Sequence, residues 1–305
     1  MKKLDYYILD VFARNKYEGN QLAVYIDLSN ELDGEEMLKI AQEINFAEST
    51  FIKKRLQNNK YSVRIYTTES EIPFAGHPTI GTSYIIAKYL MSEPTDEIVL
   101  SLIDREIKVR LSNKNELDDS LFEMTQTQPE FLKVFQKEEI SKQLEIEEFL
   151  ISEKKPIQEI STGLPYIIIP IRDIESIEKI ELKSSKLKEF LIKNEIYKTN
   201  NPNKLSTSLF FYTEETYEKE NDYNVRMFCI EDNILKEDSA TGSANGCFLA
   251  YLLKYTSNKV KAKIEQGFQM NRKSYLYLDG KIENNKYEIK VGGYSKIISR
   301  GEWMI

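Results

Sequence analysis

Several side chains that could bind or react with a small molecule lie in two glycine turns, each at the start of an apolar helix. They lie in the segments FAGHP, with Gly76 and His77, and EDSATGS, with Gly242 and Ser243. A helix N-terminus carries unpaired N–H groups and a partial positive charge, so such a turn is a natural receptor for a carboxylate. If both turns face one cleft, they predict a site for a small carboxylate-bearing molecule. Simple capping by Thr241 or Ser243 is the alternative for either turn alone.

Three side chains are the candidates for proton transfer. Glu48 lies in INFAESTF between a predicted helix and a predicted strand, where apolar neighbours would desolvate its carboxyl group and suit it to acid/base work. His77 is the only histidine, and the positive end of its helix favours a neutral imidazole. Asp238 precedes the second turn. The alternatives are a surface carboxylate ending a helix for Glu48, a structural histidine for His77, and a complement to the helix dipole for Asp238.

The two turns belong to an internal repeat. RIYTTESEIPFAGHPTIGTSYIIAKYL, from Arg64, and RMFCIEDNILKEDSATGSANGCFLAYLLKY, from Arg226, each predict a strand, an acidic loop, a glycine turn and a helix. A shift of 166 residues places Glu71 on Glu237 and Gly76 on Gly242, whereas the two arginines differ by 162. Both helices, at about 78–90 and 243–255, are apolar around most of their circumference, which predicts a central helix in each half. Chance similarity of two helices is the alternative.

The elements around these turns mix strands and helices without regular βαβ alternation, which favours a mixed or antiparallel sheet. A helix is predicted at 33–44 and charged helices across 172–195. Strands are predicted at 4–13, 22–27, 49–54, 61–68, 97–103, 105–112, 165–171, 207–213, 223–230, 273–280, 287–293 and 295–305.

Length and pattern predict two α/β domains. The looser, more charged stretch at 117–159 contains the candidate boundary. We expect an N-terminal domain over 1–125, to which a final strand at about 298–305 can return, and a C-terminal domain over 126–297.

Composition excludes several classes of protein. The formal charge of -7 opposes nucleic-acid binding, and no uncharged run is long enough to span a membrane. The start of the chain is too charged for a signal peptide, and the two cysteines, Cys229 and Cys247, predict no disulfide framework, so a cytoplasmic location is expected. Dinucleotide, P-loop and zinc-protease motifs are absent from the sequence, so no metal and no cofactor are predicted, although a lysine-bound pyridoxal is left open.

Taken in order, the segments DVFARNKYEGNQLAV, INFAESTF, FAGHPTIGT, EDSATGSANG, EQGFQMNRKSYLYL and VGGYSKIISRGEW resemble the phenazine biosynthesis PhzF-like isomerase family over nearly the whole chain. The resemblance implies a diaminopimelate epimerase-like fold of two pseudo-symmetric halves, each a mixed sheet curled around a central helix, with the active site between them. It also implies a homodimer.

The resemblance assigns roles to particular residues. Glu48 falls on the family's catalytic acid/base, and His77 and Asp238 fall on further site positions. Asn20, Gly242 and Ser243 also fall on site positions, and the helix-end argument adds Gly76 to the substrate-binding residues. Two departures are Ala47, where many members have serine, and Ser239, where proline is frequent; Ala47 removes a possible substrate contact.

The leading hypothesis is a cofactor-independent isomerase of a small carboxylate-bearing metabolite, with proton transfer by Glu48. A racemase or epimerase of an amino acid-like substrate is one alternative, but its two-thiol form is disfavoured because Cys229 and Cys247 are not in the turns. The other is a noncatalytic metabolite-binding or regulatory protein that kept the cleft. The substrate, the pathway and the choice between isomerisation and epimerisation stay open.

Overall fold

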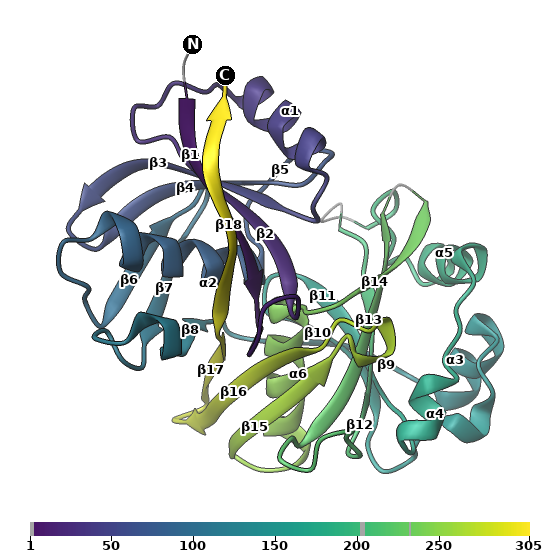
Figure 1. Ribbon diagram of the computed structural model, residues 1–305. Helices are drawn as coiled ribbons and strands as arrows, with labels where there is room; N and C mark the ends of the chain where they lie inside the picture. Colours follow the sequence, from purple (N-terminus) through teal and green to yellow (C-terminus); the bar gives the residue numbers. More distant parts are fainter. Residues whose placement is uncertain (1–2, 202–204, 232) are drawn as a thin grey trace. The chain divides into compact units, whose positions relative to one another are not determined.

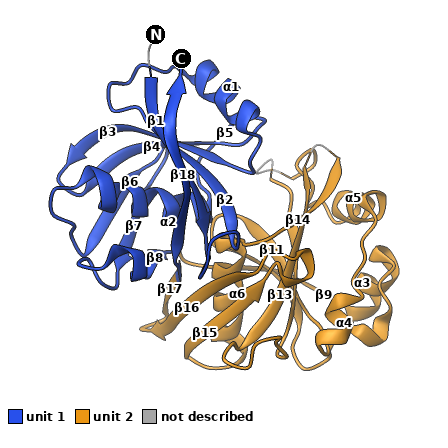
Figure 2. Ribbon diagram, in the orientation of Figure 1, with its two compact units in different colours: residues 1–125, 291–305 blue, residues 126–290 orange. Residues whose placement is uncertain are grey.

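The structure, a computed structural model, describes residues 3–201, 205–231 and 233–305. The chain divides into two compact units (Figure 2), residues 1–125 with 291–305 and residues 126–290. β17 (Lys286–Gly293) crosses from the second unit back to the first at Val291, earlier than the expected return at about residue 298. Each unit is described by itself below.

Unit 1 is a mixed sheet in the order β18-β1-β2-β3-β4-β6-β7-β8, with β5 beside β4. Only the pairs β2–β3 and β4–β6 are parallel. The last strand of the chain therefore pairs with the first, as Figure 1 shows. The strands are β1 (Lys3–Val11), β2 (Asn20–Ile26), β3 (Ser49–Gln57), β4 (Lys60–Tyr66), β5 (Glu71–Ile72), β6 (Glu97–Ser101), β7 (Glu106–Leu111), β8 (Phe122–Thr125) and β18 (Ser295–Met304).

Unit 2 repeats this order and these directions as β9-β10-β11-β12-β13-β15-β16, with β14 beside β13. Here the parallel pairs are β11–β12 and β13–β15. The strands are β9 (Glu130–Phe135), β10 (Ile157–Ser161), β11 (Pro165–Pro170), β12 (Ser208–Thr213), β13 (Tyr223–Glu231), β14 (Ile234–Asp238), β15 (Lys259–Gln266) and β16 (Ser274–Glu283).

One central helix lies in each unit. α2 (Gly76–Ile85) is buried along its whole length and contacts β1, β2, β3, β6, β7, β8 and β18. α6 (Gly242–Tyr255) is buried from its first residue to Leu253 and contacts β10, β11, β15 and β16. Both helices are buried around most of their circumference because the sheet of their own unit encloses them, so the predicted fold class is confirmed.

The remaining helices cover the outer faces of the sheets. α1 (Gly34–Ile44) covers unit 1 through Met37, Ile40 and Ala41, which pack on Tyr25 and Phe51. In unit 2, the helices pack over the sheet through an isoleucine- and leucine-rich cluster. They are α3 (Lys137–Leu144), α4 (Ile174–Glu178) and α5 (Ser184–Lys193).

The internal repeat is confirmed by strand register. Tyr66 lies opposite Glu71 in the β4–β5 pair, and Phe228 lies opposite Glu237 in the β13–β14 pair. Arg64, two residues before Tyr66, forms a two-point ion pair with Glu71. Arg226, two residues before Phe228, forms the same pair with Glu237. In each copy the guanidinium also lies over the ring, 5.3 Å from the centroid of Tyr66 in unit 1 and 4.8 Å from that of Phe228 in unit 2. The four extra residues of the second copy lie in its strand hairpin, between the arginine and the glutamate.

Several elements differ from the expectation. The helix predicted to run to residue 90 changes after Ile85 into a π-helical turn, Ile86–Leu90. The looser stretch at 117–159 contains β8, β9, α3 and the start of β10, and β15 was not predicted. In KVKAKIEQ, apolar and polar residues alternate as in a half-buried strand. Its four charged residues make the segment resemble an exposed loop.

Candidate active site

Glu48 is placed by the end of α1 and the start of β3. A capping box between Asp33 and Glu36 begins α1, and Asn45, in the left-handed conformation, ends it. Glu48 directly precedes β3, and two residues later the Thr50 hydroxyl hydrogen-bonds to that of Thr82 on α2 at 2.8 Å. The Glu48 side chain is 19% exposed, so its carboxylate is shielded but still reachable.

His77 is the second residue of α2 and is only 4% exposed. Burial lowers its pKa to about 3, and a hydrogen bond to the main-chain oxygen of Gln21 opposes this only in part. The prediction of a neutral imidazole is therefore confirmed. The main cause is burial of the ring, and not the positive end of the helix. Nε2 has no hydrogen-bond partner among the described residues, so the nitrogen that donates to Gln21 is Nδ1. Nε2 then carries a lone pair, 3.5 Å from Oε2 of Glu48.

The first turn of α2 has no side-chain cap. Its N-cap, Ala75, is extended and has no polar side chain, and the next residues are Gly76, His77 and Pro78. The carbonyl oxygen of Ala75 accepts from the hydroxyl of Thr79 at 2.8 Å, which ties the turn to the helix. The amides of Gly76 and His77 thus point from a helix end that lacks a capping oxygen, beside the Glu48–His77 pair. Asn20 is buried at the start of β2, directly before Gln21.

In unit 2, the start of α6 brings Asp238, Gly242 and Ser243 together. The N-cap is Thr241, whose hydroxyl donates to Oδ2 of Asp238 at 2.5 Å and caps no helix amide. The Ser243 hydroxyl shares a hydrogen bond of 2.7 Å with the phenol of Tyr166 on β11. Burial raises the pKa of Tyr166 far above neutrality, so this phenol stays protonated. The turn therefore combines one carboxylate with neutral hydroxyl groups.

The acid/base pair of unit 1 has no titratable equivalent in unit 2. Ser49 lies opposite Tyr66, and Leu209 lies opposite Phe228, so Leu209 is the counterpart of Ser49. Ser208, which precedes Leu209, then occupies the position of Glu48. By the same repeat, Ser243 occupies the position of His77. The units share a scaffold and the arginine–glutamate ion pair, but the side chains at the positions of Glu48 and His77 differ.

Two residues that contact this turn were not predicted from the sequence. Tyr166 was seen only as part of a predicted apolar strand. Gln266, whose side chain hydrogen-bonds to Thr241, is the last residue of a segment that was not predicted to be a strand. The sequence does contain a signal for Gln266. It is a polar residue at the end of an alternating apolar face formed by Val260, Ala262 and Ile264.

Other chemistry finds little support in the described residues. They contain no group of three or more His, Cys, Asp or Glu placed to hold a metal ion. Cys247 is buried against Thr162, and burial raises its pKa to about 12, so it stays a thiol at neutral pH. No helix in the described ranges is long and apolar enough to cross a bilayer.

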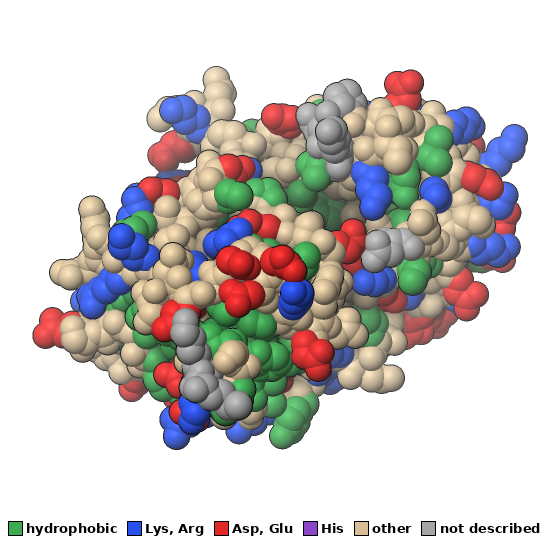
Figure 3. Space-filling model, turned by 90° about the horizontal axis from the view of Figure 1, so that it is seen from above, with side chains coloured by type: hydrophobic (Ala, Val, Ile, Leu, Met, Phe, Trp, Pro, Cys, Tyr) green, Lys and Arg blue, Asp and Glu red, His purple; other side chains and the backbone are tan. Residues whose placement is uncertain are grey.

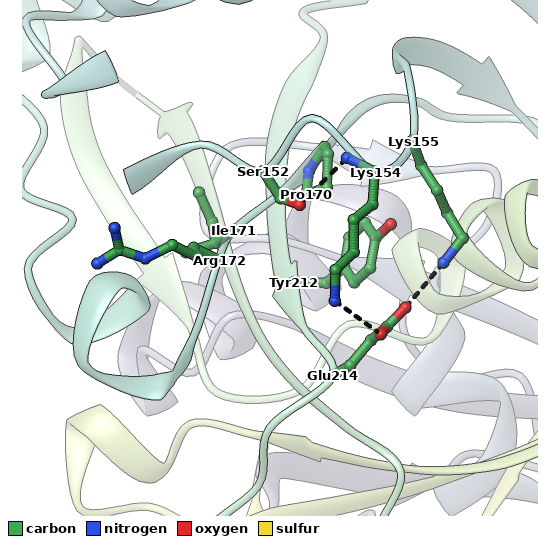
Figure 4. A pocket seen from close by; sticks show the side chains of 8 residues that line it. All are labelled: Ser152, Lys154, Lys155, Pro170, Ile171, Arg172, Tyr212 and Glu214. Carbon is green, nitrogen blue, oxygen red and sulfur yellow. Dashed lines mark hydrogen bonds and ion pairs between the residues drawn. The ribbon is translucent and has the colours of Figure 1, made fainter. Parts of the chain in front are cut away.

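A polar pocket elsewhere in unit 2 is not a rival site. Lys154 and Lys155 both pair with Glu214, at 3.7 and 2.8 Å, while Arg172 points away from them (Figure 4). The pocket has a volume of about 10 Å³, room for about one water molecule. Both lysines share one carboxylate, and a metabolite would not fit in a pocket of this volume.

Comparison with known proteins gives whole-length matches. A profile of the family described as "Phenazine biosynthesis-like protein" matches residues 9–301. An uncharacterized isomerase of Mesorhizobium japonicum is 27% identical over 100% of both chains. The trans-2,3-dihydro-3-hydroxyanthranilate isomerase of Pseudomonas aeruginosa is 42% identical over 78 residues, which are 26% of this chain and 28% of that relative.

Solved structures share the fold. A Bacillus anthracis phenazine biosynthesis protein of the PhzF family superposes with a TM-score of 0.84 at 23% identity, covering 100% of both chains. A hydroxyproline epimerase of Agrobacterium vitis superposes with a TM-score of 0.58 at 9% identity, covering 98% of this chain and 92% of that one.

Proposed function

The chain belongs to the phenazine biosynthesis-like family, and several of its relatives are named as isomerases; we propose that it isomerises a small carboxylate-bearing metabolite by proton transfer through Glu48. The Glu48 carboxylate takes a proton from an activated carbon of the substrate. The resulting carboxylic acid exchanges its proton with water, since Glu48 is partly exposed, and delivers a proton to another substrate atom, so a double bond moves and no redox change occurs. The reaction needs no cofactor.

The observation that carries this proposal is the contact between Glu48 and His77. A buried nitrogen acceptor without a hydrogen-bond partner costs free energy, so a purely structural histidine would have its Nε2 satisfied. Here Nε2 faces a partly exposed carboxylate at 3.5 Å. It can accept a hydrogen bond from the protonated form of Glu48, which stabilises the state that exists after proton removal.

The helix ends supply the substrate receptor in this proposal. The uncapped amides of Gly76 and His77 would hold the substrate carboxylate and stabilise negative charge that develops on the adjacent carbon. Gly242 and Ser243 would supply the same kind of donors from unit 2, with Asp238 as a second proton-transfer group. Asn20, buried at the start of β2, would be a further binding residue of unit 1.

The face shown in Figure 3 gives no reason to prefer a nucleic-acid substrate. Lys and Arg side chains are interspersed with Asp and Glu on the face shown in Figure 3, without a field of one sign there. Phosphate backbones bind to concentrated positive charge, which a net charge of -7 does not favour. A small molecule fits this surface and the site better.

The test is proton exchange from heavy water. Small carboxylates, among them trans-2,3-dihydro-3-hydroxyanthranilate, the compound in the relative's name, are incubated with the protein in D₂O and followed by NMR. Ala47 makes a different substrate worth including. Deuterium incorporation by the wild type and its loss in Glu48→Gln support the proposal. Incorporation that survives in a folded Glu48→Gln protein contradicts it.

Two further parts of the proposal have simple measurements. The absorbance spectrum of purified protein tests cofactor independence, because a bound pyridoxal or flavin absorbs above about 320 nm whereas protein side chains do not. Light scattering tests the homodimer that the family resemblance implies, and a monomer at working concentration would remove that expectation.

A further inference from the structure

Gln266 is the last residue of β15 and is fully buried. It pairs with Val225 of β13 and Ser274 of β16, so its main chain is fixed from both sides. Gly267 follows with a φ of +74°, and a Cβ there would lie 2.8 Å from the main-chain oxygen of Ser239. The end of β15 is therefore pressed against the turn that opens α6.

The amide of Gln266 can adopt only one orientation. The main-chain N–H of Thr241 can only donate, and it donates at 3.1 Å, so the atom facing it is Oε1 of Gln266. The same oxygen accepts from the side-chain amide of Asn245 at 3.0 Å. Nε2 is then directed to the other side, where it donates to the main-chain oxygen of Asp238 at 2.9 Å and to Oγ1 of Thr241 at 3.0 Å.

This orientation sets the direction of the next hydrogen bond. Because Oγ1 of Thr241 accepts from Gln266, its own proton is available to a different acceptor. That acceptor is Oδ2 of Asp238, at 2.5 Å. The chain of donors therefore runs from Gln266 through Thr241 to Asp238, which accepts as a carboxylate.

We propose that Gln266 is a positioning residue for Asp238: its amide orients the Thr241 hydroxyl so that Asp238 is held in place as a hydrogen-bond acceptor. The role of Asp238 in turnover rests on the proposed function, whereas the hydrogen-bond direction does not. An ordinary buried amide needs only to be satisfied. Gln266 must in addition donate toward Thr241, and this requirement can be tested by a substitution that removes the donor and keeps the shape.

The substitution is Gln266→Glu. The N–H donors of Thr241 and Asn245 favour the ionised form of the introduced carboxyl group, which accepts from both but cannot donate to the Thr241 hydroxyl. That hydroxyl then turns to the new carboxylate, so Asp238 loses the hydrogen bond from Thr241 and gains a negative neighbour. Both changes favour the protonated form of Asp238. The matched control is Gln158→Glu, because Gln158 is also a buried glutamine of unit 2, bonded to Lys254, Tyr255 and Leu132.

The main readout needs no substrate. In protein labelled with ¹³C at aspartate carboxyls, and with the Asp238 signal assigned through Asp238→Asn, the titration midpoint of Asp238 should move to higher pH in Gln266→Glu and stay in place in Gln158→Glu. An unchanged midpoint in folded Gln266→Glu overturns the proposal. If Gln266→Glu does not fold, Thr241→Val removes the same donor without a charge. An unchanged Asp238 titration in Thr241→Val likewise overturns it.

Turnover provides the second readout. If the wild type incorporates deuterium from D₂O into a carboxylate substrate, Gln266→Glu should lower the rate of incorporation by up to about 10²-fold. The KM for that substrate should change less. An exchange rate equal to that of the wild type, with a shifted Asp238 titration, contradicts the positioning role in turnover. Absence of exchange in the wild type contradicts the proposed function alone and leaves the titration as the test of Gln266.

Discussion

Arg226 and Glu237 form a two-point ion pair directly before Asp238, with both contacts at 2.8 Å. The same guanidinium donates to the main-chain oxygens of Ile177 and Ile180, each at 2.9 Å, so it joins β13, β14 and the end of α4. The strand that carries Asp238 is thus anchored one residue from its functional end.

This anchor predicts a difference between the two copies of the ion pair. Arg226→Met should lower the free energy of unfolding by about 3 kcal/mol, because the Arg226 side chain is 10% exposed and its removal leaves a shielded Glu237 unpaired. Arg64→Met should cost about 1 kcal/mol or less, since Arg64 is 34% exposed. Urea unfolding of both variants measures this. Equal losses would show that burial of the pair does not set its contribution.

His77 should stay neutral across the physiological pH range. Its pKa is lowered to about 3 in the folded protein from 6.5, so the unfolded chain binds a proton between these values and the native protein does not. The free energy of unfolding should therefore fall as pH decreases from about 6.5 to about 3, by at most about 1.4 kcal/mol per unit from this group. Above pH 6.5 the contribution is constant.

The single histidine makes this directly measurable. Its imidazole C–H resonances in the native protein should not shift between pH 8 and about 4.5. His77→Gln should have a shallower loss of stability in acid than the wild type. A native-state titration midpoint near 6.5 would contradict the buried, neutral imidazole and the acceptor role of Nε2.

Glu48→Gln should reduce turnover by at least about 10²-fold, since the amide cannot take up a proton at neutral pH. Ligand binding should weaken far less, because the proposed carboxylate receptor is the pair of helix ends. Calorimetric binding of a carboxylate ligand and the D₂O exchange rate separate the two effects. Glu43→Gln, at an exposed position near the end of α1, is the control and should behave as the wild type.

Tyr166→Phe should raise the KM of the substrate about 5-fold, from the loss of about 1 kcal/mol of hydrogen bonding to Ser243. Without the phenol, the Ser243 hydroxyl is no longer oriented by a fixed partner. Tyr251→Phe is the matched control, because Tyr251 is a buried tyrosine of the same unit whose hydroxyl donates to Pro156 at 2.8 Å. Identical effects of the two variants on KM would assign the change to general loss of packing.

The sequence predicted the parts of the fold that follow from local pattern. The central helices were predictable because the segments at about 78–90 and 243–255 lack a continuous charged face, and the repeat was predictable because both copies keep the same turn. The π-helical turn at Ile86–Leu90 and the return of the chain at Val291 were not, since neither has a distinctive local pattern.

The candidate site divides in the same way. Glu48 and His77 were found as residue types in unusual surroundings, and the structure brings them within 3.5 Å. The hydrogen bonds of Gln266 could not be predicted from the sequence, because they join it to Thr241 and Asp238, which lie 25 and 28 positions away in the chain. The protonation state of His77 was predicted for an incomplete reason, since burial by surrounding strands depends on the tertiary fold.

The two copies of the arginine–aromatic–glutamate contact have a consequence for the ancestry of the chain. Their shared register is what duplication of a single ancestral half would leave, because the scaffold of each copy had to stay foldable after the event. The positions of Glu48 and His77, in contrast, hold Ser208 and Ser243 in the second copy. Reconstructed ancestors of the two halves should therefore converge on the arginine and glutamate pair first, and on the acid/base side chains last or not at all.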